Sequence, residues 1–339
     1  MKRAAWRVLP IVVFAIALLG ALAFNIALVS RSRVALTSTI LRNPATVKTE
    51  RFHVVAILPD TADPFYTHLI EGLNEEADTQ NAALQLFYYS PGIISEGGST
   101  SEEVWRWFEI ALRSKVDGIL LFQPKDLDVQ GFAQEAEAAR VPFVPLAMDA
   151  PQNWTSSGVT GDSVSQGKEA SRLVLSLLGG AARIGIILSS DTSLGYAYNE
   201  EPFYRGVEET LKAKGGAAIV AAVREEESIL GGEDACARML TRHPDINAIL
   251  CIDAKATIGA AQVIIDRGIV GQVIIIGSDE NTEVNRLIDR GVVHSSIVRD
   301  AAAMGRMGIA LAIGQRIGIR GAERVSVGYR VIPTRGGSK

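Results

Sequence analysis

A carboxylate, a phenyl ring and a phenol stand close together in the stretch FHVVAILPDTADPFY, residues 52–66. Its apolar run VVAIL predicts a buried strand, and the proline and polar residues that follow end the strand. Asp63 lies before a proline and an amphipathic segment, which is the pattern of a helix N-cap with proline at the first helical position. Ligands of open α/β sheets bind at the carboxyl ends of strands, so Asp63, Phe65 and Tyr66 are candidate ligand-binding residues.

Three further aspartates follow apolar runs of the same kind. Asp149 comes after VPFVPLAM, Asp253 after AILCI and Asp279 after VIIIGS. Carboxylates at strand ends have three possible uses: an acid/base pair in an enzyme, hydrogen bonds to a bound ligand, or the cap of the next helix. The pattern alone leaves these three uses open.

The rest of the sequence gives an enzyme little support. It has no nucleophile elbow, phosphate loop or zinc spacing, and its histidines are scattered: His53, His68, His243 and His294. We therefore expect a binding protein with no catalytic residue, no metal ion and no cofactor.

Apolar strands alternate with amphipathic helices through the whole body. This alternation predicts an α/β fold with parallel sheets covered by helices on both faces, and its repetition predicts two similar doubly wound lobes in tandem. Gly268 and Gly291 each follow a helix, so we expect left-handed residues that end those helices. Cys236 and Cys251 are expected to be buried thiols rather than a disulfide.

The N-terminus predicts the compartment. Basic residues precede an apolar segment over residues 9–29, which as a helix would span about 30 Å of bilayer. Residues 21–23 resemble a signal-peptidase site, so cleavage before Phe24 is the alternative. We expect a retained anchor, because apolar residues continue past that site and a polar linker over residues 31–50 precedes the first strand. The body would then be extracytoplasmic.

The net charge and its distribution along the chain argue against a nucleic-acid partner. The 339 residues carry a formal net charge of −4, with acidic and basic residues interspersed along the body. A nucleic-acid partner requires a basic face, so none is expected.

Six motifs occur in order along the body: ADPFY, VDGILLFQPKD, VPFVPLAMDAP, GDSVSQGKEASRLV, HPDINAILCIDAKATIGA and VIIIGSDE. Together they resemble the type I periplasmic binding proteins of the ribose, galactose and xylose class, which are related to the ligand-binding domains of LacI-type repressors. The resemblance implies two lobes hinged by three crossings, with the ligand clamped between facing strand ends. The implied domains are an anchor over 1–30, a first lobe over 51–161 plus about 300–328, and a second over 162–299 plus about 329–339.

The resemblance also implies a sugar site. Sugars present paired hydroxyl groups and apolar C–H faces, which carboxylates, amides and aromatic rings bind. The implied ligand-binding residues are polar or aromatic and follow strands or begin helices: Asp63, Phe65, Tyr66, Asp149, Asn199, Phe203, Asp253, Asp279 and Arg299.

Departures from the family pattern bear on the ligand. Ala147 and Met148 stand where many members have Asp-Arg or Asp-Ser, and Phe203 stands where many have an arginine. Arg299 stands where glutamine or a similar residue is common, and it would restore one positive charge. A less polar or differently shaped ligand is therefore an alternative to a ribose-like sugar. A cationic ligand is another, because carboxylates outnumber the arginine.

Two binding functions differ in their partner. The protein would capture a small carbohydrate-like ligand and present it to the permease of an ABC importer, which is the commoner use of the family and the function we favour. Alternatively, a membrane-anchored subunit would signal occupancy to a histidine kinase or chemoreceptor. A folded scaffold that binds no ligand is a third option, suggested by the missing polar groups.

Overall fold

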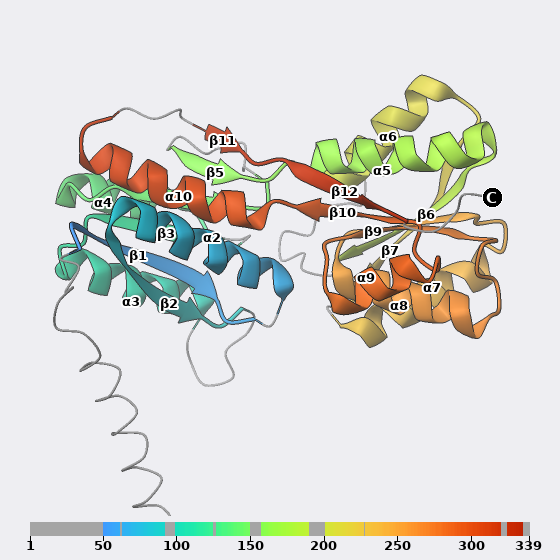
Figure 1. Ribbon diagram of the computed structural model, residues 1–339, viewed down its shortest axis with the longest axis horizontal. Coiled ribbons are helices and arrows are strands. Elements are labelled where there is room, and N and C mark those ends of the chain that lie inside the picture. Colours follow the sequence, from blue (N-terminus) through green and yellow to red (C-terminus); the bar gives the residue numbers. More distant parts are fainter. Residues whose placement is uncertain are drawn as a thin grey trace, which may run out of the picture. The chain divides into compact units, whose positions relative to one another are not determined.

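Two six-stranded sheets run through the part of the chain that the computed structural model describes (Figure 1). The described residues are 50–61, 63–91, 99–124, 127–149, 157–189, 201–226, 228–319 and 324–334. No helix among them is long and apolar enough to cross a membrane. The predicted anchor over residues 9–29 lies outside this range.

The first sheet has the strand order β11-β5-β4-β3-β1-β2, and all its neighbouring strands are parallel. Its strands are β1 (Phe52–Pro59), β2 (Ala82–Tyr89), β3 (Gly118–Phe122), β4 (Phe143–Ala147), β5 (Gly158–Thr160) and β11 (Arg324–Ser326). Four helices pack against it, α2 and α10 on one face and α3 and α4 on the other. They are α2 (Pro64–Gln80), α3 (Thr100–Arg113), α4 (Gln130–Ala139) and α10 (Ala301–Arg316).

Burial on both faces explains why these strands are continuous apolar runs. In β1, Val54 and Leu58 pack with residues of α2 and α10, whereas Val55 packs with residues of α3 and α4. The two sets alternate because successive side chains of a strand point to opposite faces.

The second sheet has the order β12-β10-β9-β8-β6-β7. Its strands are β6 (Arg183–Ser189), β7 (Ala218–Glu225), β8 (Ala248–Cys251), β9 (Ile274–Ser278), β10 (Ser295–Arg299) and β12 (Tyr329–Pro333). Helices α5 and α6 pack on one face, and α7, α8 and α9 pack on the other. They are α5 (Ser163–Leu178), α6 (Pro202–Lys214), α7 (Ile229–Arg242), α8 (Ala254–Asp266) and α9 (Thr282–Asp289), with a 3₁₀ turn at Gly179–Ala181.

The chain passes between the two sheets three times: from β5 into α5, from β10 into α10 and from β11 into β12. Backbone hydrogen bonds hold these passages together, since the N–H of Val327 donates to the oxygen of Thr160 over 2.8 Å and that of Asp300 donates to Gly328 over 3.2 Å. The predicted fold class of two α/β lobes is therefore confirmed. One difference is β12, which runs antiparallel to β10.

Several local predictions are also confirmed. Gly268 and Gly291 have φ angles of +65° and +71°, the left-handed conformation expected after a helix. Cys236 and Cys251 are buried and not joined to each other. Burial raises the pKa of the Cys236 thiol to about 12, so it stays protonated at neutral pH.

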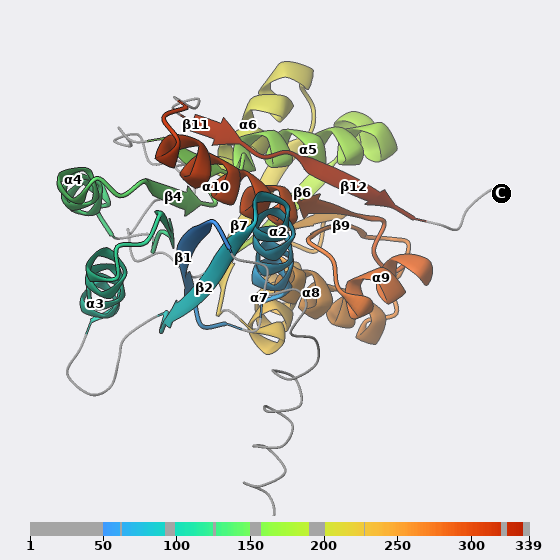
Figure 2. The same ribbon diagram turned by 60° about the vertical axis from the view of Figure 1, so that its left-hand side comes forward.

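Helix α10 completes the first lobe although the whole second lobe precedes it in sequence. It lies beside α2 in both ribbon views (Figures 1 and 2). Glycines permit the close approach, because a β-carbon at Gly72 would lie 2.0 Å from the oxygen of Ala302, and one at Gly305 would lie 2.3 Å from that of Leu69.

Replacing Gly72 with alanine should therefore destabilise the protein. We expect Gly72→Ala to lower the free energy of unfolding by about 1–3 kcal/mol, because α10 must move away from α2. The control is Gly131→Ala in α4, where a β-carbon would meet no atom within 4 Å. That variant should be neutral or more stable by up to about 1 kcal/mol. Urea titration measures both, and equal losses would contradict the role of the helix contact.

Candidate ligand-binding site

Charged side chains from both sheets gather at the carboxyl ends of the strands. Asp63 follows β1 and Asp149 follows β4, while Asp253 follows β8, Asp279 follows β9 and Arg299 ends β10. The charges of Asp63, Asp253 and Asp279 act on Arg299, and the charge of Arg299 acts on Asp149. These residues form one electrostatic group, which we call the strand-end cluster.

The tightest contact in the strand-end cluster joins Asp279 to Arg299. Nε of Arg299 donates to Oδ1 of Asp279 over 2.8 Å, and Nη2 donates to Oδ2. Asp279 is 5% exposed. Burial alone would lower the pKa of Arg299, but the carboxylates, Asp279 foremost, raise that pKa above its ordinary value and keep the guanidinium charged. A two-point contact of this kind fixes the orientation of the guanidinium as well as its position.

The backbone at Asp279 is itself held by the neighbouring strand. Asp279 has a φ of 60°, a left-handed conformation that costs a residue other than glycine about 1–3 kcal/mol. Its N–H donates to the oxygen of Ile297 over 2.9 Å, and its oxygen accepts from Oγ of Ser296 over 2.6 Å. Both partners belong to β10, so the turn after β9 is tied to the strand that carries Arg299.

Arg299 also contacts the first lobe. Its guanidinium carbon lies over the ring of Phe65, 4.7 Å from the centroid, which is a cation–π arrangement. Its Nη1 lies 3.1 Å from the sulfur of Met148, just after β4. Phe65 is only 3% exposed and meets Tyr66 and Phe122 edge to face, with centroid separations of 5.2 and 6.0 Å. Arg299 and these rings therefore cover Phe65.

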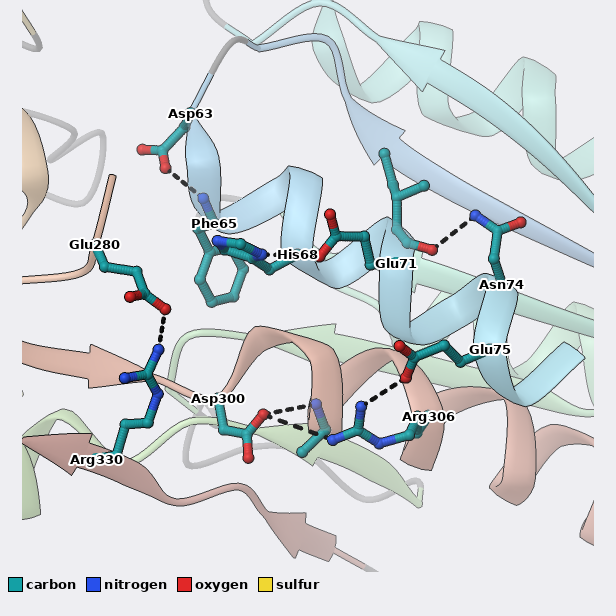
Figure 3. Close-up of polar contacts among 12 residues, drawn as sticks. Asp63, Phe65, His68, Glu71, Asn74, Glu75, Glu280, Asp300, Arg306 and Arg330 are labelled. Atoms are coloured by element: carbon teal, nitrogen blue, oxygen red, sulfur yellow. Dashed lines mark hydrogen bonds and ion pairs between the residues drawn. The ribbon is translucent and has the colours of Figure 1, made fainter. Parts of the chain in front are cut away.

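Two aspartates of the strand-end cluster cap helices, which was one of the uses that the sequence left open. Oδ1 of Asp63 accepts from the N–H of Phe65 over 2.9 Å at the start of α2 (Figure 3). Oδ1 of Asp253 accepts from the N–H of Ala256 over 2.8 Å at the start of α8. Each cap leaves Oδ2 outside the capping bond, so a cap does not prevent a ligand contact.

Asp149 accepts a hydrogen bond from the backbone at the point where the chain first passes from the first sheet to the second. Its Oδ1 accepts from the N–H of Ser163, 3.0 Å away, at the start of α5. Burial raises the pKa of Asp149, and the hydrogen bonds from Ser163 only partly offset this. Burial also raises the pKa of Asp253, and the negative charge of Asp279 adds to the increase.

One predicted site residue lies away from the strand-end cluster and from the rings that contact Arg299. Phe203 is 2% exposed and packs in the core between α5, α6 and the second sheet, so its position gives no support to stacking on a ligand. It lies in the first turn of α6, one residue after Pro202, and is among the buried residues of that helix. Asn199 lies outside the described residues.

Sequence reasoning missed two residues of this region. Neither is among the predicted ligand-binding residues, although Phe122 is the last residue of β3 and Met148 directly follows β4. Strand-end position was the available signal for each. Within the described residues, no three histidine, cysteine or acidic side chains are arranged to hold a metal ion.

Two α/β lobes that the chain joins by three passages, with charges from both lobes gathered at the strand ends, define the class of two-lobed ligand-binding proteins. Residues 54–318 match the family model of the periplasmic binding protein domain, and the chain belongs to this family. The resemblance inferred from the sequence is confirmed at this level.

Individual relatives are distant. The chain is 24% identical over 264 residues to the D-allose-binding periplasmic protein of Escherichia coli K12, covering 76% of this chain and 82% of that protein. It is 22% identical over 279 residues to the ribose import binding protein RbsB of the same organism, covering 82% and 88%. It shares its fold with an ABC transporter periplasmic solute-binding protein of Actinobacillus succinogenes 130z solved with bound D-allose, with a TM-score of 0.73, 17% identity, and 84% and 98% of the two chains covered.

Separating Asp279 from Arg299 should be costly. We expect Asp279→Ala or Arg299→Ala to lower the free energy of unfolding by about 3–5 kcal/mol, because each leaves a buried charge unpaired. The double variant should lose less than the sum of the two. Arg183→Ala is the control, since its ion pair with Asp245 is about half exposed and should matter little. Strictly additive losses in urea titrations would show that the pair is not coupled.

Asp149 should make stability depend on pH. Its pKa in the folded protein lies above the ordinary 3.8, so in the pH range just above 3.8 the folded chain binds more protons than the unfolded chain. Stability from this group therefore increases as pH falls through that range. Asp149→Asn keeps an oxygen for Ser163 but cannot take up the proton.

The measurement is the free energy of unfolding of both proteins at about pH 7 and about pH 4. We expect the wild type to gain on the Asp149→Asn variant upon acidification. A parallel change in the two proteins, or a loss by the wild type, would contradict the raised pKa.

Proposed function

We propose that this chain is an extracytoplasmic solute-binding protein that clamps a small sugar between its two lobes and presents it to an ABC importer. The observation that carries the proposal is the strand-end cluster, in which Arg299 contacts Asp279 in one lobe and Phe65 in the other. A ligand at this place would touch both lobes, and its binding would favour one arrangement of them. The permease would recognise that arrangement.

The chemistry of the cluster fits a polyhydroxylated ligand. Carboxylate oxygens of Asp63, Asp149 and Asp253 accept hydrogen bonds from hydroxyl groups, and Arg299 donates to hydroxyl or ring oxygens. Relatives named for D-allose and ribose agree with a sugar of five or six carbons. We propose binding without a catalytic step, because these groups are held by helix ends or by one another.

The proposal is tested by calorimetric titration of the full-length chain in mild detergent with D-allose, D-ribose, D-glucose, D-galactose and D-arabinose. We expect at least one to bind with a dissociation constant of about 1 μM or tighter. At a ligand concentration about 100-fold above that constant, the melting temperature should rise by roughly 5 °C. The L-enantiomer of the sugar that binds is the control. A folded protein that binds none of the five would contradict the function.

We further propose that residues 9–29 remain on the mature protein as a membrane anchor. Their apolar run is long enough to span a bilayer and continues past the cleavage-like sequence at residues 21–23. Membrane fractionation followed by mass spectrometry of the N-terminus tests this. We expect the protein in the membrane fraction with its N-terminal segment intact, whereas a mature protein that begins at Phe24 would refute the anchor.

A further inference from the structure

Both oxygens of the Asp279 carboxylate already accept a hydrogen bond from the protein. Both of its oxygens accept from Arg299, at 2.8 Å from Nε for Oδ1 and from Nη2 for Oδ2, and the residue is 5% exposed. Each oxygen keeps a further lone pair, but the burial of the residue leaves a ligand hydroxyl little access to it. The backbone of the turn at Asp279 is held by Ile297 and Ser296, and Arg299 holds the carboxylate itself. These contacts suit a residue that orients Arg299 better than one that binds a ligand.

Arg299 has donors left over. A guanidinium carries five N–H groups in a rigid fork, and the contacts with Asp279 use two of them. The sulfur of Met148 takes a third, as a weak acceptor. The remaining two, on Nη1 and Nη2, meet no acceptor among the residues that the structure describes. Unpaired donors on a largely buried arginine point to a ligand with acceptor oxygens.

The charges nearby decide which ligand this is. Asp279 neutralises Arg299, and the negative charges of Asp63 and Asp253 also act on the guanidinium. A ligand carboxylate brought to Arg299 would therefore be repelled by two carboxylates whose charge Arg299 does not balance. A neutral sugar has no such penalty, because its oxygens can accept from Arg299 while its hydroxyl groups donate to Asp63 and Asp253.

We propose that Arg299 contacts the bound sugar and determines specificity, that Asp279 is a positioning residue for Arg299, and that the pair selects neutral sugars over sugar acids. This inference rests on the proposed function. The negative charge of Asp279 balances the positive charge of Arg299, so that the site does not attract anions.

The test compares each neutral sugar with its uronic acid by calorimetric titration of the full-length chain. The pairs are D-glucose and D-glucuronate, D-galactose and D-galacturonate, D-allose and D-alluronate, and D-ribose and D-riburonate. For the sugar that binds, we expect the wild-type affinity for the neutral form to be at least 100-fold higher than the affinity for its uronic acid. Arg299→Lys keeps the charge but loses the planar fork, and should weaken binding of the neutral sugar at least 10-fold.

Asp279→Asn separates positioning from direct contact. It keeps an oxygen for Nε of Arg299 but removes the balancing charge, so the preference should shift towards the uronic acid by at least 10-fold. If Asp279 bound the sugar itself or served only the fold, the variant would weaken both ligands by the same factor. Arg306→Gln is the matched control, because Arg306 pairs with Glu75 on the exposed face of α10 and α2 (Figure 3) and should leave both affinities unchanged.

The outcomes separate this inference from the proposed function. A wild type that binds a neutral sugar, with an unchanged affinity in Arg299→Lys or an unchanged preference in Asp279→Asn, would overturn the inference alone. Equal wild-type affinity for both members of a pair would do the same. A folded wild type that binds neither member of any pair would overturn the proposed function and the inference together. Circular dichroism of each variant verifies folding, and the two conservative substitutions give independent readouts if one protein misfolds.

Discussion

The buried ion pair of Asp279 and Arg299 is the interaction on which the arrangement of the strand ends depends. Arg299 lies where the chain leaves the second sheet for α10, so one side chain is bound by the second lobe and contacts the first. Taking two charges out of water is expensive, and the pair is favourable only because its geometry is good and its surroundings hold it. Removing one partner of a buried ion pair generally costs about 3–5 kcal/mol, which is large beside the roughly 5–15 kcal/mol by which folded proteins are stable, so such a contact constrains the residues around it.

The other three carboxylates of the strand-end cluster already accept hydrogen bonds at the beginnings of helices, which limits how many of their oxygens a ligand can use. Asp63 and Asp253 each accept from the first turn of a helix, where the partial positive charge of the helix terminus also stabilises a carboxylate. Asp149 accepts from the start of α5 and is still difficult to ionise because it is buried. The strand-end cluster has four carboxylates and one arginine. Because several of the carboxylate oxygens already accept hydrogen bonds from the protein, fewer of them are free to accept from a ligand than the formal charge suggests. This is our physical reason for proposing a neutral polyol rather than a metal ion or an organic cation as the ligand.

The sequence of the strands and the first turns of the helices determined much of the local structure. The apolar run of β1 and the Asp63–Pro64 pair predicted a buried strand and a capped helix, because propensity and capping act over a few neighbouring residues. The short strands β5, β11 and β12 were not predicted. They have three to five residues, and β11 and β12 are partly exposed, so no hydrophobic period marks them.

What the sequence by itself determined was the two-lobed α/β fold and the set of polar strand ends, since periodicity and turn chemistry are local. Only the tertiary structure decided which of those residues meet. It joined Asp279 to Arg299, covered Phe65 with that arginine, and placed Phe203 in the core, because each outcome depends on contacts between residues far apart in the chain. The sequence could indicate that carboxylates and an arginine follow strands. It could not indicate that one carboxylate already belongs to the arginine, because that depends on the distance between two strand ends across a folded sheet.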